Sequence, residues 1–254
     1  MANSKGELEG KVAIVTGGGR GIGKAISSRL AEAGAAVVVA DIDTRLAHEV
    51  IKEINGRQGK SKACLVDVSD EKSVESMFKV ALKTFGRLDI LVNNAGIMFR
   101  TRFLDISLEE WEKTMSVNLR GAFLCIKRAL PTMKKQGYGR IVNISSSAGR
   151  SVSTLGGAHY TASKAGLLGL TRAVAKEMAP FGITVNAICP GLIDTKMARE
   201  TTSKKELEAF LKSFPIKRLG LPEEIGDLVV FLCSDKAAYI TGASIDINGG
   251  DLMI

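Results

Sequence analysis

The sequence is poor in the residues that would indicate a disulfide scaffold, a zinc site or a membrane protein. It holds four cysteines and two histidines in 254 residues. Cys64, Cys125, Cys189 and Cys233 lie far apart, in apolar surroundings and without C-x-x-C spacing, which favours buried reduced thiols. No apolar run approaches the roughly 18 residues of a membrane helix, and the N-terminal residues lack a signal-peptide pattern. We therefore expect a soluble cytoplasmic protein without a metal or a membrane partner.

A long linker and a concentrated basic region are also missing. The net charge is +8, but the lysines and arginines are spread over helical stretches with glutamates between them, and no aromatic residues alternate with them. This pattern argues against a nucleic-acid partner and leaves a general attraction for anionic ligands. Because about 200 to 250 residues commonly form one α/β domain, we expect residues 1–254 to be a single domain.

What the sequence does contain is a glycine-rich stretch, Thr16 to Gly23, between the apolar run 12–15 and a helical pattern. Backbone N–H groups of such a strand-turn-helix unit, together with the helix dipole, bind a diphosphate. The G-x-G-x-x-G fingerprint fits no register here. The phosphate loop of NTPases fails at Ala25, where a hydroxyl is required. The spacing that remains is Gly17-x-x-x-Gly21-x-Gly23.

The next apolar run, 36–40, ends in Asp41, about 20 residues after the glycine turn. A carboxylate at that position accepts hydrogen bonds from the ribose 2′- and 3′-hydroxyls of NAD and repels the 2′-phosphate of NADP. Arg20, in the turn, would instead bind that phosphate. NAD is the predicted cofactor, with NADP as the alternative, and a solvated loop acid is the reading of Asp41 without a ligand.

Further apolar runs alternate with helical patterns along the chain, at 63–68, 90–92, 139–144, 183–188 and 245–247. This alternation predicts an α/β fold, a doubly wound (Rossmann) domain with a seven-stranded parallel sheet, whose site lies at the carboxyl ends of the strands. Asp67 falls near such an end and would contact the adenine amino group. Residues 108–136 read as a long helix that is interrupted near Asn118 and Gly121.

A tyrosine and a lysine then lie on one face of a helix that opens near Tyr160, because Tyr160 and Lys164 are four residues apart. Ser145, Ser146 and Ser147 follow the preceding strand, where hydroxyls can bind a substrate carbonyl. Transfer of a hydride to a ketone requires polarisation of the carbonyl and delivery of one proton. Tyrosine, with a pKa of about 10, can deliver it when a nearby ammonium such as that of Lys164 stabilises the phenolate.

Together these residues resemble the short-chain dehydrogenase/reductase family over about residues 10–250. The matching motifs are Thr16-Gly-x-x-x-Gly-x-Gly23, Asp67, Asn93-Asn94-Ala95-Gly96 and Tyr160-x-x-x-Lys164. The resemblance implies a catalytic set of Asn118, Ser146, Tyr160 and Lys164, in which Asn118 holds a water and Lys164 also holds the nicotinamide ribose. Counting forward from the strand favours Ser146 and counting back from Tyr160 favours Ser147, and we choose Ser146.

The resemblance also implies which residues bind the dinucleotide, with Ile193 and Thr195 against the nicotinamide carboxamide. The full set is Gly17, Arg20, Gly21, Ile22, Gly23, Asp41, Asp67, Val68, Asn94, Ala95, Gly96, Tyr160, Lys164, Pro190, Gly191, Ile193 and Thr195. It further implies a substrate lid at about 192–213, although an ordinary surface helix fits the pattern of that region equally well.

The implied function is an oxidoreductase that interconverts a ketone and a secondary alcohol. Residues 218–225 and 239–242 resemble 3-oxoacyl-[acyl-carrier-protein] reductases, whereas Asp41 departs from their usual NADP use. A sugar or other secondary-alcohol dehydrogenase is one alternative, and a dinucleotide-binding regulatory protein without turnover is another. The family also implies a homotetramer. An acidic acyl carrier protein could be steered by basic residues on adjoining helices, namely Lys127, Arg128, Lys134, Lys135, Arg172 and Lys176.

Overall fold

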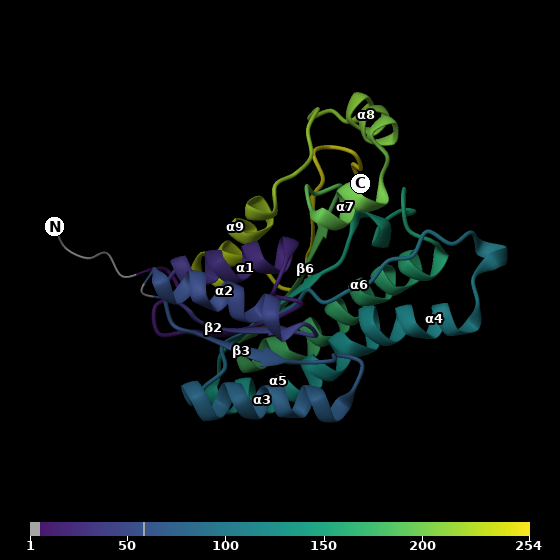
Figure 1. Cartoon of the computed structure of the whole chain (residues 1–254). Coiled ribbons are helices and arrows are strands. Elements are labelled where there is room, and N and C mark those ends of the chain that lie inside the picture. The colour runs from purple at the N-terminus through teal and green to yellow at the C-terminus, as the bar shows by residue number, and fades with distance from the viewer. Residues whose placement is uncertain (1–5, 58) are drawn as a thin grey trace.

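The strands form a twisted parallel sheet in the middle of the molecule (Figure 1). The computed structural model describes residues 6–57 and 59–254, with only the backbone at 197 and 201. Within these residues the sheet has seven strands in the order β3-β2-β1-β4-β5-β6-β7, every neighbouring pair parallel. The strands are β1 (Val12–Thr16), β2 (Ala36–Asp41), β3 (Ser61–Leu65), β4 (Ile90–Asn93), β5 (Gly139–Ile144), β6 (Ile183–Pro190) and β7 (Ser244–Ile247). This order reverses beside β1 and confirms the predicted doubly wound fold.

Burial explains why most strands were recognisable as apolar runs. All residues of β1, β2, β4, β5 and β6 are buried, as expected of parallel strands covered on both faces. The prediction for the third strand was shifted, because β3 ends at Leu65 and not at Val68. Val66 and Val68 lie beyond it but are still buried in the core, which extends the apolar run past the strand. Asp67 therefore lies in the loop that follows β3.

The helices cover both faces of the sheet (Figure 1). One core layer holds buried side chains of α1 (Gly21–Glu32), α2 (Thr44–Gly56) and α9 (Pro222–Cys233). The opposite layer holds those of α3 (Glu71–Phe85), α5 (Gly121–Gln136) and α6 (Ala158–Met178). Short 3-10 turns lie at Phe103–Asp105, Ser147–Gly149, Ala179–Phe181 and Asp235–Ala237. No helix in the described part of the chain is both long and apolar enough to cross a bilayer.

The predicted interruption of the long helix is present. Helix α4 (Leu108–Met115) passes through a π-helical turn (Ser116–Arg120) into α5, and Asn118 lies in that turn. Gly121 begins α5 against the loop after β3, since a Cβ there would lie 2.9 Å from the Val68 side chain. Such π turns are frequent at functional sites because they re-aim a few side chains without ending the helix.

Two short helices, α7 (Lys196–Thr201) and α8 (Lys204–Ser213), follow β6 at the carboxyl edge of the sheet. Figure 1 shows α8 at the outer edge of the molecule, beyond α7 and away from the sheet. The charged segment near 197–212 is thus helical in part.

The four cysteines are free and buried, and burial raises the thiol pKa to about 12 at Cys125 and Cys233 and to about 11 at Cys189.

Candidate active site

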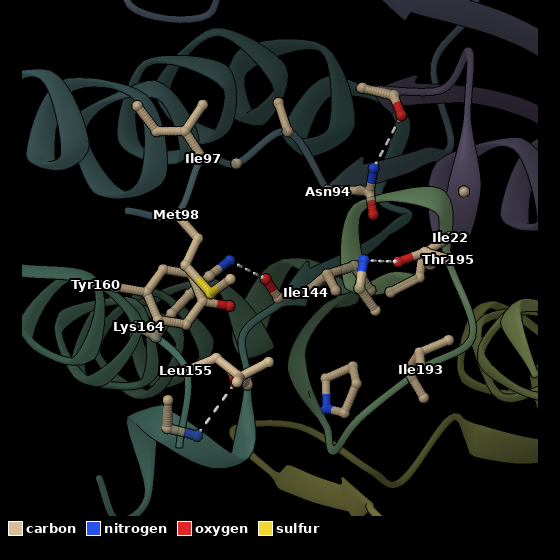
Figure 2. Close-up of a pocket in the computed structure, with 18 of the residues that line it drawn as sticks. Ile22, Asn94, Ile97, Met98, Ile144, Leu155, Tyr160, Lys164, Ile193 and Thr195 are labelled. Carbon is tan, nitrogen blue, oxygen red and sulfur yellow. Dashed lines mark hydrogen bonds between the residues drawn. The ribbon is translucent and has the colours of Figure 1, made fainter. Parts of the chain in front are cut away.

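A cavity of about 670 Å³ opens at the carboxyl ends of the central strands. Every predicted site residue lines it except two, Gly23 and Asn118. Asp41 lies at one end, and Ser146, Tyr160 and Lys164 lie at the other. Figure 2 shows Tyr160, Lys164 and Met98 gathered on one side of the cavity and Asn94, Ile22 and Thr195 on the other. The fold therefore brings together residues that are far apart in the sequence.

The glycine turn joins β1 to α1 in a conformation that requires glycine. Gly17 and Gly21 have φ angles of +61° and +51°, in the left-handed region that other residues avoid. Gly23 packs against the turn and not into the cavity, since a Cβ on it would lie 2.0 Å from the Gly17 carbonyl oxygen. The N-terminus of α1, at Gly21 and Ile22, faces the cavity, where its N–H groups and dipole can bind a diphosphate.

Asp41 is held rigidly at the end of β2. Its side chain is buried; Oδ2 accepts a hydrogen bond of 2.9 Å from the Gly19 N–H, and Oδ1 accepts one of 3.0 Å from the Asp43 N–H. Each carboxylate oxygen keeps a further lone pair, so the fixed carboxylate can accept both hydroxyls of a ribose. Arg20 lines the same end of the cavity with an exposed side chain.

Asn94 braces the glycine turn against β4. Its Nδ2 donates hydrogen bonds of 3.0 Å to the carbonyl oxygens of both Thr16 and Gly17. The preceding residue, Asn93, donates from Nδ2 to Oδ1 of Asn143 at 2.8 Å, which joins β4 to β5 beneath the site. Asn93 and Asn94 thus fix the positions of the glycine turn, β4 and β5 relative to one another.

Asp67 lines the cavity beside Val68, in the loop after β3. Its Oδ1 accepts hydrogen bonds from the Ser69 hydroxyl at 2.6 Å and from the Ser69 N–H at 2.9 Å. These bonds, with a smaller contribution from the charge of Lys113, hold the pKa of Asp67 below its usual range. The carboxylate remains an acceptor at neutral pH, as a contact with the adenine amino group requires.

The last residue of β6 and the residues after it form the wall between the two ends of the cavity. Pro190, Gly191, Ile193 and Thr195 all line it. Thr195 is the N-cap of α7, because its hydroxyl accepts a hydrogen bond of 3.2 Å from the Ala198 N–H. The segment that would face a nicotinamide is therefore tied to the start of α7.

Tyr160 lies in the first turn of α6 and lines the cavity together with Ser146, whose side chain acts to lower the Tyr160 pKa. Ser145 is turned away, because its buried hydroxyl donates to the Lys164 carbonyl oxygen at 2.9 Å. Ser147 also lines the cavity. Ser146 and Ser147 thus both face the cavity, and the Tyr160 pKa is influenced by Ser146.

Burial governs the protonation of the tyrosine and the lysine. It raises the pKa of Tyr160, an effect that the Ser146 hydrogen bond partly offsets, and it lowers the pKa of Lys164 to about 8. The Lys164 Nζ donates to the Ile144 carbonyl oxygen at 2.8 Å and lies 5.7 Å from the centre of the Tyr160 ring. The expected lowering of the Tyr160 pKa by Lys164 is not found here. A raised pKa keeps the Tyr160 phenol protonated at neutral pH.

Asn118 lies behind the cavity wall. Its Oδ1 accepts from the Ile97 N–H at 2.8 Å, and its Nδ2 donates to the Ile97 carbonyl oxygen at 2.9 Å and to the Ser163 hydroxyl at 3.1 Å. A Cβ on Gly96 would lie 3.4 Å from Asn118 Oδ1 and 3.5 Å from Lys164 Nζ. The Asn118 side chain thus fixes the segment after β4 close to the lysine.

The sequence did not reveal the apolar wall at the tyrosine end of the cavity. It is formed by Ile97, Met98, Leu155, Leu192, Phe210 and Phe214. These residues come from loops and from the α8 region, where neither strand alternation nor helical spacing marks the side that faces inward. The two phenylalanines in a highly charged segment were the available signal.

The parallel sheet, the glycine turn at its carboxyl edge and the tyrosine, lysine and serine in the same cavity are together typical of dinucleotide-dependent oxidoreductases. Within the described residues no group of His, Cys, Asp and Glu side chains is arranged to hold a metal ion.

Comparison with known proteins leads to the same class of enzyme. A family model described as enoyl-(acyl carrier protein) reductase matches residues 17–251. The 3-oxoacyl-[acyl-carrier-protein] reductase FabG of Aquifex aeolicus is 42% identical over 245 residues, covering 96% of this chain and 98% of the relative. The 3-oxoacyl-[acyl-carrier-protein] reductase of Synechocystis sp. is 43% identical over 248 residues, covering 97% and 98%.

Solved structures show the same similarity. The crystal structure of gox2181 superposes with a TM-score of 0.93 at 36% identity and covers 96% of each chain. Levodione reductase superposes with a TM-score of 0.92 at 34% identity, covering 96% of this chain and 98% of that one. The chain belongs to the short-chain dehydrogenase/reductase family. It is an enzyme that transfers a hydride between a nicotinamide dinucleotide and a ketone or secondary alcohol, so the alternative of a regulatory protein without turnover is not retained.

Proposed function

We propose that this enzyme is an NAD(H)-linked ketone reductase in which Ser146, Tyr160 and Lys164 carry the chemistry and Asp41 selects the cofactor. The observation that supports this most directly is that one cavity has a fixed, buried carboxylate at one end and a buried tyrosine beside a serine at the other. The glycine turn lies along the same cavity, where it would bind the diphosphate between them.

In the reduction direction, a ketone oxygen would accept hydrogen bonds from the hydroxyls of Ser146 and Tyr160. A reduced dinucleotide bound in the cavity would supply the hydride for the carbonyl carbon, and Tyr160 would pass its phenol proton to the oxygen to give the alcohol. The phenolate left behind would lie near the Lys164 ammonium, whose positive charge stabilises it at that moment. Lys164 would also donate to the nicotinamide ribose, and Asn118 would keep the segment beside the lysine in place.

Our choice of NAD rests on Asp41. A 2′-phosphate at the ribose would lie against a carboxylate that two backbone N–H groups prevent from turning aside. Arg20 is in reach of the same end of the cavity, but its side chain is exposed and makes no ion pair within the described residues. NADP therefore remains the alternative cofactor, with Arg20 as the residue that would bind it.

We further propose a 3-oxoacyl thioester as the substrate. The wall of Met98, Leu155, Phe210 and their neighbours suits an acyl chain, whereas the hydroxyls of a sugar would need polar partners along it. The printed names of the Aquifex and Synechocystis relatives point to the same substrate class.

The direct test compares NADH oxidation with acetoacetyl-CoA against NAD⁺ reduction with glucose, followed by the absorbance of NADH. We expect turnover of the thioester and little of the sugar. Efficient glucose oxidation without thioester reduction would establish the sugar dehydrogenase alternative.

An acidic acyl carrier protein is the proposed donor of that substrate. All six basic residues named for this role are exposed on α5 and α6. Lys134 also lies over the ring of Phe181, in the 3-10 turn after α6, with its Nζ 3.9 Å from the ring centre, so the C-terminal ends of α5 and α6 are close together. If the surface steers an acidic carrier, kcat/KM for the carrier-bound substrate should fall with salt much more than for acetoacetyl-CoA. An equal salt effect on kcat/KM for both substrates would reject an acidic carrier protein as the donor of the substrate.

We also propose a homotetramer. Large apolar side chains are exposed outside the cavity, among them Phe103, Leu104, Leu108 and Phe123 near α4 and α5, and Tyr239 before β7. Burial of such patches between copies of one chain is the usual route to symmetric oligomers. Light scattering at micromolar concentration should give four times the chain mass, and a monomer mass would reject the proposal.

A further inference from the structure

Helix α8 places part of the apolar wall over the cavity while standing apart from the sheet. Phe210 lies on α8 and Phe214 follows its last residue; both line the cavity, and Phe214 is buried. The chain just after the C-terminal end of α8 is joined to the C-terminal loop, because the Ile216 N–H donates to the Gly249 carbonyl oxygen at 3.1 Å. A separate contact is needed to fix the N-terminal end of α8.

An ion pair provides such a contact at the first turn of α8. The Arg100 Nη2 lies 3.1 Å from the Glu206 Oε1, and the two residues are 106 positions apart in the chain. Arg100 follows Met98 by two residues, in the segment after β4 that forms the opposite side of the cavity. The pair therefore joins the two sides of the substrate end.

Glu206 is itself held in place by the first turn of α8, in which it lies. In the capping box of α8, its Oε2 accepts from the Ser203 N–H at 2.9 Å and from the Ser203 hydroxyl at 2.8 Å. These bonds, followed by the one from Arg100, lower the pKa of Glu206 to about 2. The carboxylate is thus pre-oriented and charged throughout the working pH range of an enzyme.

We propose that Arg100 is a positioning residue that holds α8, and with it Phe210, closed over the substrate. The inference goes beyond the hydride-transfer activity and rests only on the segment at 196–213 acting as the cover of the substrate end. Substrate entry and product release then require the Arg100–Glu206 pair to separate. Because the two partners are oppositely charged and partly exposed, salt controls how often the cover opens.

The expected effect is modest, since both side chains are about two-fifths exposed, at 38% and 42%. Exposed ion pairs of this kind contribute little, and loss of the pair corresponds to an about two- to fivefold larger open population of the cover. The effect should vanish at ~1 M salt, where the Debye length is about 3 Å.

The test measures amide hydrogen exchange in residues 204–213 of the full-length protein for the wild type, Arg100→Met, Arg100→Lys and Arg102→Met. Arg102 is the matched control, an exposed arginine of the same segment for which the described residues show no ion pair. Arg100→Met should speed exchange about two- to fivefold at low salt and not at ~1 M salt. Arg100→Lys should restore most of the protection, and Arg102→Met should match the wild type.

The variant Ser203→Ala distinguishes the effect of the ion pair from the effect of the helix cap. It weakens the capping box without removing Arg100, so its faster exchange should persist at high salt. Steady-state kinetics add a second readout: Arg100→Met should raise KM for the ketone and leave KM for NADH unchanged.

The proposal is overturned if Arg100→Met leaves the exchange of α8 unchanged, if Arg102→Met has the same effect, or if the change is independent of salt. The exchange experiment needs no substrate. Failure of the substrate assignment would therefore leave this test intact, and the two outcomes can be told apart.

Discussion

Replacement of Asp41 by serine should convert this enzyme from an NAD-preferring to an NADP-accepting one. In the wild type, two backbone N–H groups fix the buried carboxylate at the end of β2, where it cannot rotate away from a ligand. Serine removes the charge and leaves room for a 2′-phosphate. Arg20, at the same end of the cavity, is then free to bind that phosphate.

The magnitude follows from the two interactions that change. Like charges about 4 Å apart repel by about 4 kcal/mol at an effective dielectric constant of 20. If solvent and Arg20 offset half of this, about 2 kcal/mol remains, which is roughly a 30-fold preference for NAD. The variant should also lose charge-assisted hydrogen bonds to the ribose, each contributing about 1.5 kcal/mol or more, so kcat/KM with NADH should fall by more than tenfold.

The assay measures kcat/KM with NADH and with NADPH for the wild type, Asp41→Ser and Asp43→Ser. Asp43 is the matched control, because it is the N-cap of α2, serine can replace it in that role, and its side chain does not line the cavity. Only Asp41→Ser should change the cofactor preference. A wild type that favours NADPH, or an unchanged preference in Asp41→Ser, would refute the reasoning and make Arg20 the specificity residue.

Two further predictions concern the lysine and the glycine turn. Burial lowers the pKa of Lys164 to about 8, so its ammonium form dominates below that pH, and NADH binding followed by fluorescence should weaken as the pH rises through about 8. Lys164→Met should show no such step, and a step of equal size in that variant would assign the titration to another group. Gly23→Ala should reduce both Tm and NADH affinity, because its Cβ would lie 2.0 Å from the Gly17 oxygen. Gly56→Ala is the control, since a Cβ there meets nothing within 4 Å, and an equal loss in both variants would reject the explanation by crowding.

The cofactor half of the site was largely predictable from the sequence because it depends on backbone geometry. Gly17 and Gly21 need left-handed φ angles, and Asp41 ends a strand whose side chains are all buried, so short-range patterns record both requirements. The doubly wound fold was predictable because its buried strands appear in the sequence as apolar runs that alternate with helical patterns. The boundary of β3 was not, since Val66 and Val68 are buried outside the strand and look like part of it.

The substrate half depends on contacts that no local pattern records. The apolar wall assembles Met98, Leu155 and Phe210 from three separate segments, and the Arg100–Glu206 pair joins residues that are distant in the chain. The protonation of Tyr160 was also beyond the sequence. The motif indicated an ammonium four residues away, whereas burial is what raises the pKa of the phenol in the folded protein.

The measurement that tests the central claim most directly is NADH oxidation by the wild type and by Tyr160→Phe with the same ketone, together with the Kd of NADH for each protein. Our proposal gives proton delivery to the Tyr160 hydroxyl, and its removal leaves Asp41 and the glycine turn at the other end of the cavity unchanged. We predict a loss of turnover of at least ~10²-fold with an unchanged Kd for NADH. A Tyr160→Phe enzyme that keeps near wild-type turnover would contradict the assignment.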